Sequence, residues 1–599
     1  MLQKKFNFTA SSKEDFVKVS ASDLYDANKG YGFVTEAVRN ADELLKIPEL
    51  NSAFDPWYWL AGEELTKLSD SSYGVTLSDG KDIPLIFKAD LGKQGNYRIK
   101  LTINGGADGI NGLYIFTGRR RMMARDINIA PGEAYTAEYT INICDIVPRG
   151  KTEPYTDTTL DIALVASVSG NPTLASLEIE AVDVPTIYIA GDSTVTDQSG
   201  AYPYDPGCCY SGWAQVFPML FDTSVAVSNH AHSGLTTESF RGEGHHAIVE
   251  KYIKPGDYFF MQFAHNDQKL QHLDAYGGYA NNLRRYVNEI REKGATPIIV
   301  TPICRNTWKP DGTYNDLLFD YDKACKQVGE ELSVPVLNLH DKSMAFILEV
   351  GLEAAKSYYM HKDYTHSNDY GAYKMAHYVA EDLIKFGPKE LADAVKLTGK
   401  EWVAPEKIIM PQPPADFEDK SASQFAMKFK DLDKCPEKDA IAALTAKGII
   451  PNEENFRPND IITRVEALAW IIKAVSFVPV NVYNDMYPDV IGHEWYAGTV
   501  ESAYQNKLVD AALTADGKFH PLEEVTAEQL VSFMINAYKS RKNVSSDVAP
   551  CDIAGVSDYA KVYVAAAKKL NFIKDNFEAG KKLTRAEACV YVKALAESV

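Results

Sequence analysis

The chain has 599 residues, of which 45% are hydrophobic and 11% aromatic, and its formal net charge is −20. A single hydrophobic core seldom grows beyond about 250–300 residues, so we expect several globular domains. An acidic chain without a basic stripe is a poor ligand for nucleic acid and for anionic membranes. We therefore expect neither nucleic acid nor a membrane among its partners.

Eight cysteines are scattered along the chain without a paired spacing, apart from the adjacent Cys208 and Cys209, whose direct bridge would be strained. The fold is therefore not expected to depend on disulfides. The first residues, MLQKKFNF, are not followed by an apolar run of about 7–15 residues, as a signal peptide would require. As written, the sequence predicts a cytoplasmic protein, or a cell-surface or secreted one if a leader has been removed.

Residues 1–183 are predicted to form a β-sandwich. Short strand-like runs, separated by Gly, Asn, Asp and Pro, occur at 97–103, 112–116, 139–143, 160–166 and 175–181, and several of them alternate apolar and polar residues. This pattern is typical of antiparallel strands with one buried face. Arg119–Arg121 are interpreted as a solvated strand end or turn. Phe54–Trp59 suits a platform for a sugar ring, but packing is favoured because two tryptophans bury much apolar area.

Residues 184–395 alternate strands and helices. The apolar run Thr186–Ala190 predicts a buried strand that breaks at Gly191. Further strands are predicted at 224–228, 258–262, 296–301 and 334–339, and helices at 213–217, 279–293, 321–332 and 370–386. This alternation implies a three-layer α/β domain with a parallel sheet. Ser193 follows the first strand, at the carboxyl edge where such sheets hold ligands.

Later residues supply chemical partners for Ser193. A serine hydroxyl becomes nucleophilic when a base removes its proton, and a histidine serves best when a carboxylate fixes its tautomer. Asp363 and His366, three residues apart before a predicted helix, supply both groups. The oxyanion formed on attack needs donors, and we expect the backbone N–H groups of Ser193 and Gly234 and the side-chain amide of Asn266.

In this order the residues resemble the four sequence blocks of the SGNH (GDSL-type) hydrolases, namely Gly191-Asp192-Ser193, Gly234, Asn266-Asp267 and Asp363-x-x-His366. The stretches Gly212-Trp213-x-Gln215 and Gln262-Phe263-x-His265-Asn266-Asp267 are similar to the rhamnogalacturonan acetylesterase branch. The resemblance covers about residues 185–388. Ala264 departs from it, because glycine usually precedes the His-Asn-Asp triplet.

The resemblance implies a carboxylic ester hydrolase that removes acetyl groups from a carbohydrate through Ser-His-Asp acyl-enzyme catalysis. The expected substrate is an acetylated pectic poly- or oligosaccharide of the rhamnogalacturonan type. Asp192, Trp213 and His265 are the candidates for lining the substrate cleft. No metal or organic cofactor is expected. His361, close to the catalytic Asp-His pair, could suggest a metal site, but the spacing typical of metal ligands is missing.

Two alternatives stay open. One is an esterase acting on another acetylated glycan, such as xylan. The other is a non-catalytic cell-wall or carbohydrate-binding protein, against which the complete set of catalytic residues argues. The N-terminal sandwich resembles the galactose-binding-like modules of carbohydrate enzymes. The pair His245-His246 is interpreted as a surface feature rather than a metal site.

Residues 396–424, which contain four prolines, predict a linker or a strap along the surface. Residues 425–599 contain an internal repeat with a period of about 60 residues. Phe456, Phe519 and Phe577 each precede by seven residues the threonine that opens one of the segments 463–466, 526–529 and 584–587. These Thr-x-x-Glu/Gln segments predict capping boxes at helix starts.

Each repeat resembles an S-layer homology module, in which a Thr-Arg-x-Glu stretch helps bind an acidic secondary cell-wall polymer. Arg464 and Arg585 retain the charged residue, whereas the second copy has Ala527. Two interpretations therefore stay open. The repeats bind a cell-wall polymer, or the motif persists because a helix begins there.

Overall fold

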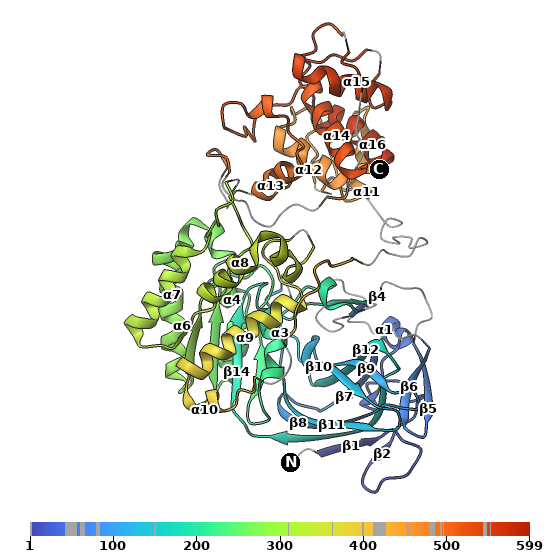
Figure 1. Cartoon of the computed structure of the whole chain (residues 1–599), viewed down its shortest axis with the longest axis vertical. Coiled ribbons are helices and arrows are strands. Elements are labelled where there is room, and N and C mark those ends of the chain that lie inside the picture. Colours follow the sequence, from blue (N-terminus) through green and yellow to red (C-terminus); the bar gives the residue numbers. More distant parts are fainter. Residues whose placement is uncertain are drawn as a thin grey trace. The chain divides into compact units, whose positions relative to one another are not determined.

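The computed structural model describes residues 3–41, 57–59, 66–79, 84–148, 151–202, 204–309, 311–361, 363–397, 401–410, 427–451, 454–477, 486–490, 494, 496–542, 548–551, 553–574 and 576–599. The chain divides into two compact units (Figure 1). The first comprises Met1–Asn306 and Asp316–Phe417, and the second Thr307–Asn315 and Glu418–Val599.

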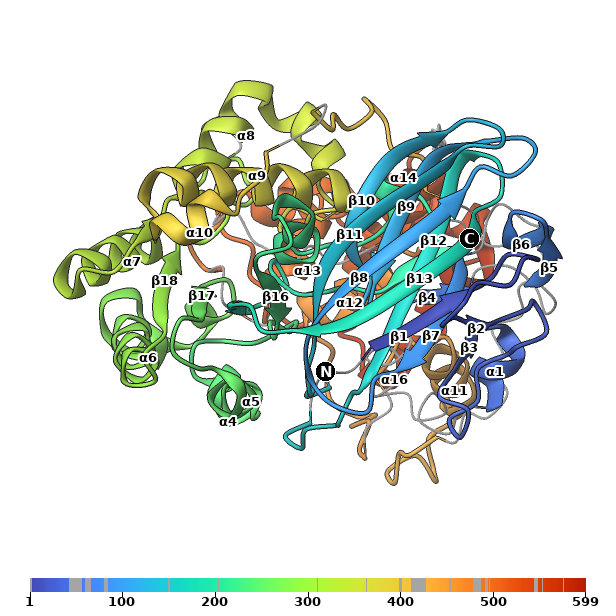
Figure 2. The same ribbon diagram turned by 90° about the horizontal axis from the view of Figure 1, so that it is seen from below.

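The first unit begins with a sandwich of two sheets (Figure 2). One sheet has the order β11 (Ala134–Ile143), β8 (Gly95–Asn104), β13 (Thr173–Val182), β1 (Gln3–Asn7) and β2 (Val17–Lys18), extended by β6 (Gly74–Asp79) and β5 (Lys67–Ser71). The other has the order β10 (Arg121–Ile129), β9 (Ile110–Thr117), β12 (Thr159–Ser169), β7 (Leu85–Asp90) and β3 (Tyr31–Phe33). All five predicted strand runs lie within strands of these sheets.

The alternation arises because every second side chain of a strand points into the space between the sheets. In β8, Tyr97, Ile99, Leu101 and Ile103 are buried, and the residues between them face outward. They join Phe87 and other residues of the second sheet in one hydrophobic cluster. A short helix, α1 (Glu36–Ala41), completes this part of the described chain.

A parallel five-stranded sheet follows, with the order β16 (Ala226–Asn229), β14 (Thr186–Gly191), β17 (Tyr258–Gln262), β18 (Thr296–Val300) and β19 (Val336–Leu337). The helices of this domain are α3 (Trp213–Val216), α4 (Ser239–Gly242), α5 (His245–Tyr252), α6 (Ala280–Glu292), α7 (Phe319–Leu332), α8 (Leu339–Ala355), α9 (Asp369–Phe386) and α10 (Lys389–Asp393). The predicted parallel sheet with flanking helices is confirmed.

The two faces of this sheet are covered by different helices (Figure 1). On one face Phe259 and Met261 of β17 join a cluster with residues of α5, α6 and α7. On the other face Phe260 meets the ring of Phe217, which follows α3. Successive residues of β17 thus serve opposite layers, as the pleat of a strand requires.

The aromatic segment Phe54–Trp59 is described in part. Residues 54–56 lie outside the described residues. The backbone of β4 (Trp57–Trp59) pairs in parallel with β15 (Gly200–Tyr202), which lies a few residues after Ser193. The choice between a sugar platform and packing therefore stays a prediction.

Residues 401–410 form the predicted strap along the first unit. Trp402 is buried and contacts the rings of Tyr370 and Tyr373 on α9 and of Tyr114 on β9. One side chain thus packs against both the α/β domain and the sandwich. Residues 398–400 and 411–424 of the predicted linker lie outside the described residues.

The second unit is built from helices: α11 (Lys438–Ala446), α12 (Arg464–Ala474), α13 (Ala497–Gln505), α14 (Ala527–Lys542), α15 (Lys561–Lys569) and α16 (Arg585–Ser598). Thr463 caps α12 and Thr584 caps α16, each in a complete capping box with Glu466 or Glu587. At α14, Thr526 exchanges the corresponding hydrogen bonds with Gln529. The predicted helix starts are confirmed, and these helices share one hydrophobic core.

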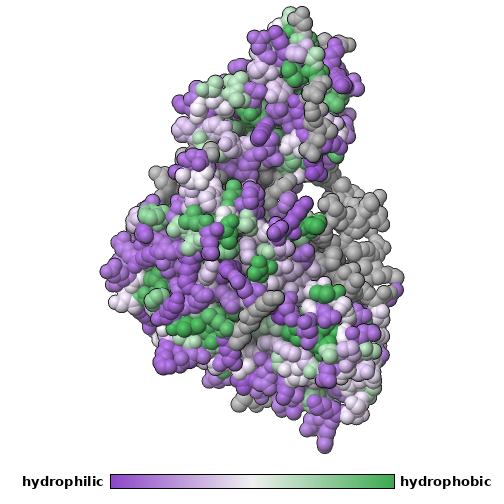
Figure 3. Space-filling view, in the orientation of Figure 1, coloured by the Kyte–Doolittle hydropathy of each residue, from purple (hydrophilic) through white to green (hydrophobic). Residues whose placement is uncertain are grey.

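Hydrophilic residues predominate on the visible face of the molecule, interrupted by small apolar patches (Figure 3). Within the described part of the chain, every helix is too short or too polar to span a bilayer.

Candidate active site

Ser193 lies in a tight turn at the carboxyl end of β14, the strand between β16 and β17. A Cβ on Gly191 would lie 2.6 Å from Val195 Cγ2 and 2.8 Å from the carbonyl oxygen of Gln262. Only glycine fits there, because real Cβ atoms do not approach other atoms so closely. The end of β14 can therefore lie this close to Gln262 at the end of β17, just before Ser193.

A chain of hydrogen bonds between buried side chains supports this turn on its interior side. Trp213 Nε1 donates to Gln262 Oε1 (2.9 Å), and Gln262 Nε2 donates to Thr194 Oγ1 (2.7 Å). Thr194 Oγ1 in turn donates to Asp192 Oδ1 (2.7 Å). Both Trp213 and Asp192 are 0% exposed, so the prediction that they line the substrate cleft is wrong. The Trp213 N–H and Asp192 Oδ1 have hydrogen-bond partners inside the domain, whereas Asp192 Oδ2 has none among the described residues.

Ser193, His366 and Asp363 are brought together in one line. Ser193 Oγ lies 2.7 Å from His366 Nε2, and His366 Nδ1 lies 2.8 Å from Asp363 Oδ2. Asp363 Oδ1 accepts from the backbone N–H groups of Thr365 and His366. Burial alone would raise the pKa of Asp363, but the charge of His366 and these hydrogen bonds lower it below its usual value. The carboxylate is therefore charged at neutral pH.

The predicted oxyanion donors follow the two strands that flank β14. Gly234 comes after β16, with φ +90° and an exposed backbone, and Asn266 comes after β17. Asn266 Nδ2 donates to Leu235 O (3.0 Å), and its Oδ1 accepts from Lys269 Nζ (2.8 Å). An amide nitrogen carries two protons, so one N–H of Asn266 is left for a substrate oxygen. Within the described residues, the backbone N–H groups of Ser193 and Gly234 meet no acceptor.

Comparison with known proteins agrees with this geometry. The model of the GDSL-like Lipase/Acylhydrolase family matches residues 189–373. Rhamnogalacturonan acetylesterase RhgT of Bacillus subtilis is 34% identical over 230 residues, which are 36% of this chain and 97% of that protein. The chain belongs to the GDSL-like hydrolase family. It is a carboxylic ester hydrolase, and its residues 428–468 match an S-layer homology domain.

A longer match extends outside the hydrolase domain. The uncharacterized esterase YxiM of Bacillus subtilis is 28% identical over 393 residues, which are 64% of this chain and 91% of that protein. The solved structure of YxiM has 25% sequence identity and a TM-score of 0.34, covering 64% of this chain and 98% of that one.

In this GDSL hydrolase His265 is also buried, contrary to its predicted place in the substrate cleft. Its Nδ1 accepts from Arg305 Nε (3.1 Å), and its carbonyl oxygen accepts from Arg305 Nη2 (3.1 Å). Burial, followed by the charge of Arg305, lowers the pKa of His265 well below its usual value, so the ring is neutral. Sequence reasoning missed Arg305. The sequence did offer one signal for its role, because Arg305 follows β18 and so lies at the carboxyl edge of the sheet, as Ser193 does.

Ala264 occupies a left-handed backbone conformation, with φ +115°. This is the position where the family usually has glycine, the residue that adopts positive φ without strain. Asp267 holds the segment in place, because its Oδ2 accepts from the N–H of Ala264 and its Oδ1 from Thr237. The departure seen in the sequence therefore corresponds to a strained backbone next to the site.

Two interpretations of charged segments are wrong. His245 and His246 are 2% and 1% exposed, because α5 packs them against the rings of Phe240 and Tyr286. Burial lowers the pKa of His245 to about 4. Arg119 and Arg120 do lie in a turn and Arg121 begins β10, but Arg120 is not solvated. Arg120 is 1% exposed and lies inside the α/β domain.

Among the described residues, two clusters outside the site have the composition of a metal centre: His246 with Glu250 and Glu289, and Cys304 with Asp316 and His340. His340 Nε2 lies 3.0 Å from Asp316 Oδ2, and its Nδ1 lies 3.0 Å from the carbonyl oxygen of Pro302. Burial opposes the charge of His340, but the bond to Asp316 raises its pKa to about 11. Both ring nitrogens of His340 thus have protein partners, which fix the imidazole within the cluster.

Proposed function

We propose that the chain is a carbohydrate O-acetylesterase in which Ser193 is the nucleophile. The observation that supports this most directly is the 2.7 Å contact between Ser193 Oγ and His366 Nε2. As Oγ bonds to the acetyl carbon, His366 takes the hydroxyl proton at Nε2, and the charge of Asp363 stabilises the resulting imidazolium. Ser193 is 9% exposed and the side chain of His366 is 20% exposed, so both residues of the pair have some contact with solvent.

The carbonyl oxygen becomes an oxyanion in this step. We assign its stabilisation to the backbone N–H groups of Ser193 and Gly234 and to Asn266 Nδ2. When the tetrahedral intermediate collapses, His366 returns its proton to the leaving sugar hydroxyl and acetyl-Ser193 is left. Water then attacks the acetyl group with His366 as general base, and acetate leaves.

The proposed substrate is an acetylated rhamnogalacturonan. The similarity to RhgT, which is named as a rhamnogalacturonan acetylesterase, supports it. The hydrogen-bonded set around Trp213 and Gln262 supports it too, because these residues carry the resemblance to that branch. Acetylated xylan is the alternative substrate.

Acetate release from acetylated rhamnogalacturonan and from acetylated xylan tests this proposal. Ser193→Ala should abolish release, whereas Ser224→Ala, a change of an exposed serine in the same domain, should leave it at the wild-type level. Release from xylan alone would keep the chemistry and change the substrate. Absence of release from both glycans and from an aryl acetate would refute the esterase proposal and favour a binding role.

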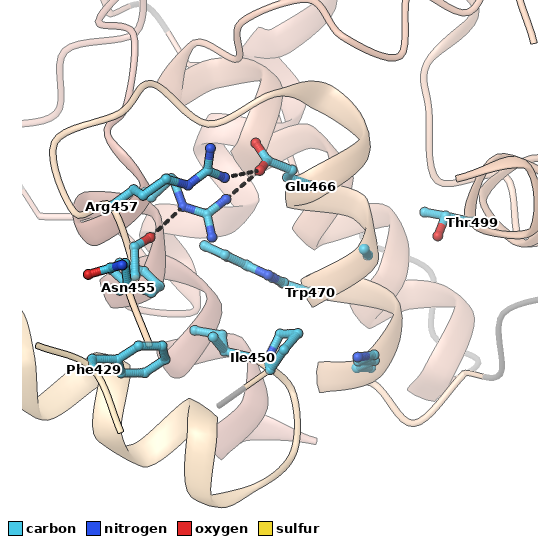
Figure 4. Close-up of a pocket in the computed structure, with 12 residues that line it drawn as sticks. Phe429, Ile450, Asn455, Arg457, Glu466, Trp470 and Thr499 are labelled. Atoms are coloured by element: carbon cyan, nitrogen blue, oxygen red, sulfur yellow. Dashed lines mark hydrogen bonds and ion pairs between the residues drawn. The ribbon is translucent and has the colours of Figure 1, made fainter. Parts of the chain in front are cut away.

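For the S-layer homology repeats we propose attachment to an anionic cell-wall polymer, which places the enzyme at the cell surface. A cavity of about 470 Å³ in the second unit supports this. Figure 4 shows Arg457, Glu466 and Trp470 in its lining. The Arg585 guanidinium lies 5.1 Å from the ring centres of both Phe456 and Trp470. Sugar rings stack on aromatic faces, and guanidinium groups bind carboxylates, so the lining suits an acidic saccharide.

The two arginines of the repeat motif differ in their surroundings. Arg464 is 2% exposed and donates to the carbonyl oxygens of Phe519 and Leu513. Arg585 lines the cavity and pairs with Glu466. We therefore assign polymer binding to Arg585 and a structural role to Arg464. Sedimentation with purified cell-wall sacculi, with and without residues 425–599, tests the attachment.

A further inference from the structure

The turn between β9 and β10 of the sandwich carries an arginine that enters the hydrolase domain. Arg120 has φ +57° and follows Gly118, with φ +50°. A positive φ is unfavourable for arginine and persists only where surrounding contacts fix it. Arg120 is 1% exposed, and its guanidinium lies among residues of the α/β domain.

The Arg120 guanidinium makes at least five hydrogen bonds, as many as it has N–H groups. Nε donates to Gln198 O (3.1 Å), and Nη1 donates to both carboxylate oxygens of Asp369 (3.1 and 2.8 Å). Nη2 donates to Tyr210 O (2.5 Å) and to Gln215 Oε1 (3.3 Å). These hydrogen bonds hold three segments of the hydrolase domain against one side chain of the sandwich. The segments are those of Gln198, of Tyr210–Gln215 and of Asp369.

The first of these segments carries the nucleophile. Gln198, whose carbonyl oxygen is bound by Arg120, donates from Nε2 to Ser193 O (3.2 Å) and to Ser233 Oγ (3.3 Å). Ser233 directly precedes Gly234. Arg120 is therefore linked through Gln198 to Ser193 by two hydrogen bonds, and by two to Ser233, the residue before the proposed oxyanion donor Gly234.

The other two segments lie next to the proposed general base, His366. Asp369 is the first residue of α9, three residues after His366. The ring of Tyr210 packs edge-on against the His366 imidazole, with 5.9 Å between ring centres. Gln215 connects the two sides, because its Nε2 donates to the carbonyl oxygens of Arg120 and Gln198. Arg120 thus bridges the loop of Ser193 and the loop of His366.

The neighbouring arginines make the same connection. Arg121 Nε pairs with Asp197 Oδ2 at 2.7 Å, and Asn229 Nδ2 donates to Asp197 Oδ1 (2.8 Å) and to Val195 O (3.0 Å). Arg119 Nη2 donates to Asp197 O (3.3 Å). All three arginines of the turn therefore reach the segment that follows Ser193.

We propose that Arg120 is a positioning residue for the esterase reaction, through which the sandwich sets the distance between Ser193 and His366. This rests on the proposed function. The sandwich is then a structural part of the active site rather than an appended module. Arg120 is buried and does not touch substrate, so its loss should act on the rate of acylation rather than on substrate binding.

The test is steady-state hydrolysis of an aryl acetate by the full chain carrying Arg120→Lys. Lysine keeps the charge opposite Asp369 but cannot form the guanidinium fork. Because misplacement of a reacting group by about 1 Å can cost about 10²-fold, we expect kcat to fall by about 10²-fold with KM within twofold. Labelling of Ser193 by a fluorophosphonate should slow in parallel. Leu101→Ala, in the sandwich core, is the control for a loss of stability that leaves the bridge intact.

Gln198→Ala keeps the carbonyl oxygen that Arg120 binds but removes the side-chain bonds to Ser193 and Ser233, so it cuts the link from Arg120 to the nucleophile without leaving a buried charge. It replaces Arg120→Lys if that variant does not fold. A kcat about tenfold below wild type in folded Gln198→Ala supports the proposal. Wild-type kcat in folded Arg120→Lys or Gln198→Ala overturns it, as does an equal loss in Leu101→Ala. If wild type shows no Ser193-dependent hydrolysis at all, the esterase proposal fails, which is a different outcome from an active enzyme that does not need Arg120.

Discussion

Arg120 in the sandwich and Asp369 at the start of α9 form a buried ion pair, with 2.8 Å between Nη1 and Oδ2. Burial acts against both charges, but the carboxylate raises the pKa of Arg120 above its ordinary value. Such a pair is stable only while both partners are present. The sandwich and the hydrolase domain are therefore coupled in folding as well as in geometry.

The first prediction concerns this pair. Asp369→Ala leaves the guanidinium buried without a counter-charge, and we expect it to lower the free energy of unfolding by about 3–5 kcal/mol. Urea denaturation followed by circular dichroism measures the change. Adding Arg120→Met to Asp369→Ala should recover part of the loss. Equal stability of Asp369→Ala and wild type would contradict the coupling.

The second prediction concerns pH. The pKa of folded Asp363 is depressed, so its contribution to stability is present above its unfolded pKa of about 4 and is lost as pH falls through the lower folded value. Wild type should therefore lose this stability below about pH 4. Asp363→Asn removes the titrating group and should show a shallower decline in melting temperature over this range. It should also lower kcat by about 10²–10⁴-fold at neutral pH, since an amide cannot stabilise the imidazolium. An unchanged acid profile in Asp363→Asn would refute the assignment.

The third prediction concerns the oxyanion. Asn266→Ala removes one donor and should lower kcat by about 10²–10³-fold with little change in KM. Asn281→Ala, on α6 with Asn281 bonded to Arg284, is the matched control and should keep wild-type kcat. A normal rate in Asn266→Ala would show that the oxyanion is stabilised by other groups.

The fourth prediction concerns the strained backbone at Ala264. Ala264→Gly relieves the positive φ, and after the entropy cost of glycine we expect a net gain of about 0.5–1 kcal/mol. Ala372→Gly, in the interior of α9, should instead lose about 1 kcal/mol. Thermal melts of the two variants should shift in opposite directions. A loss of stability in Ala264→Gly would contradict the strain.

The fifth prediction separates the two repeat arginines. Arg585→Ala should reduce sedimentation with cell-wall sacculi several-fold, whereas Arg464→Ala should leave sedimentation of the folded protein unchanged. Arg585→Ala should also cost some stability, because Arg585 donates to Phe456 O and pairs with Glu466. Arg464→Ala should lower the melting temperature, because it leaves the carbonyl oxygens of Phe519 and Leu513 without their donor. Lys593→Ala, on the exposed side of α16, is the control for charge alone. Undiminished sedimentation of Arg585→Ala would exclude the cavity as the polymer site.

The sequence by itself was enough to predict the secondary-structure layers of the domains and the order of the catalytic residues along the chain. Alternation in residues 97–103 predicts a half-buried strand, and the capping box at Thr463 predicts the start of α12, because these signals depend on neighbours along the chain. Ser193, Asp363 and His366 were identifiable because their spacing follows the blocks of the family. Parallel strands then bring their carboxyl ends to one edge.

Only the tertiary structure decided which polar residues are buried and what they do there. Trp213, Asp192 and His265 carry the motif, yet their contacts with Gln262, Thr194 and Arg305 place them beneath the site. Arg120 looked like a solvated turn residue because its five acceptors lie between 78 and 249 positions further along the chain. Local sequence records which groups can form hydrogen bonds, but a buried charge is stable only where the fold brings its partners to it.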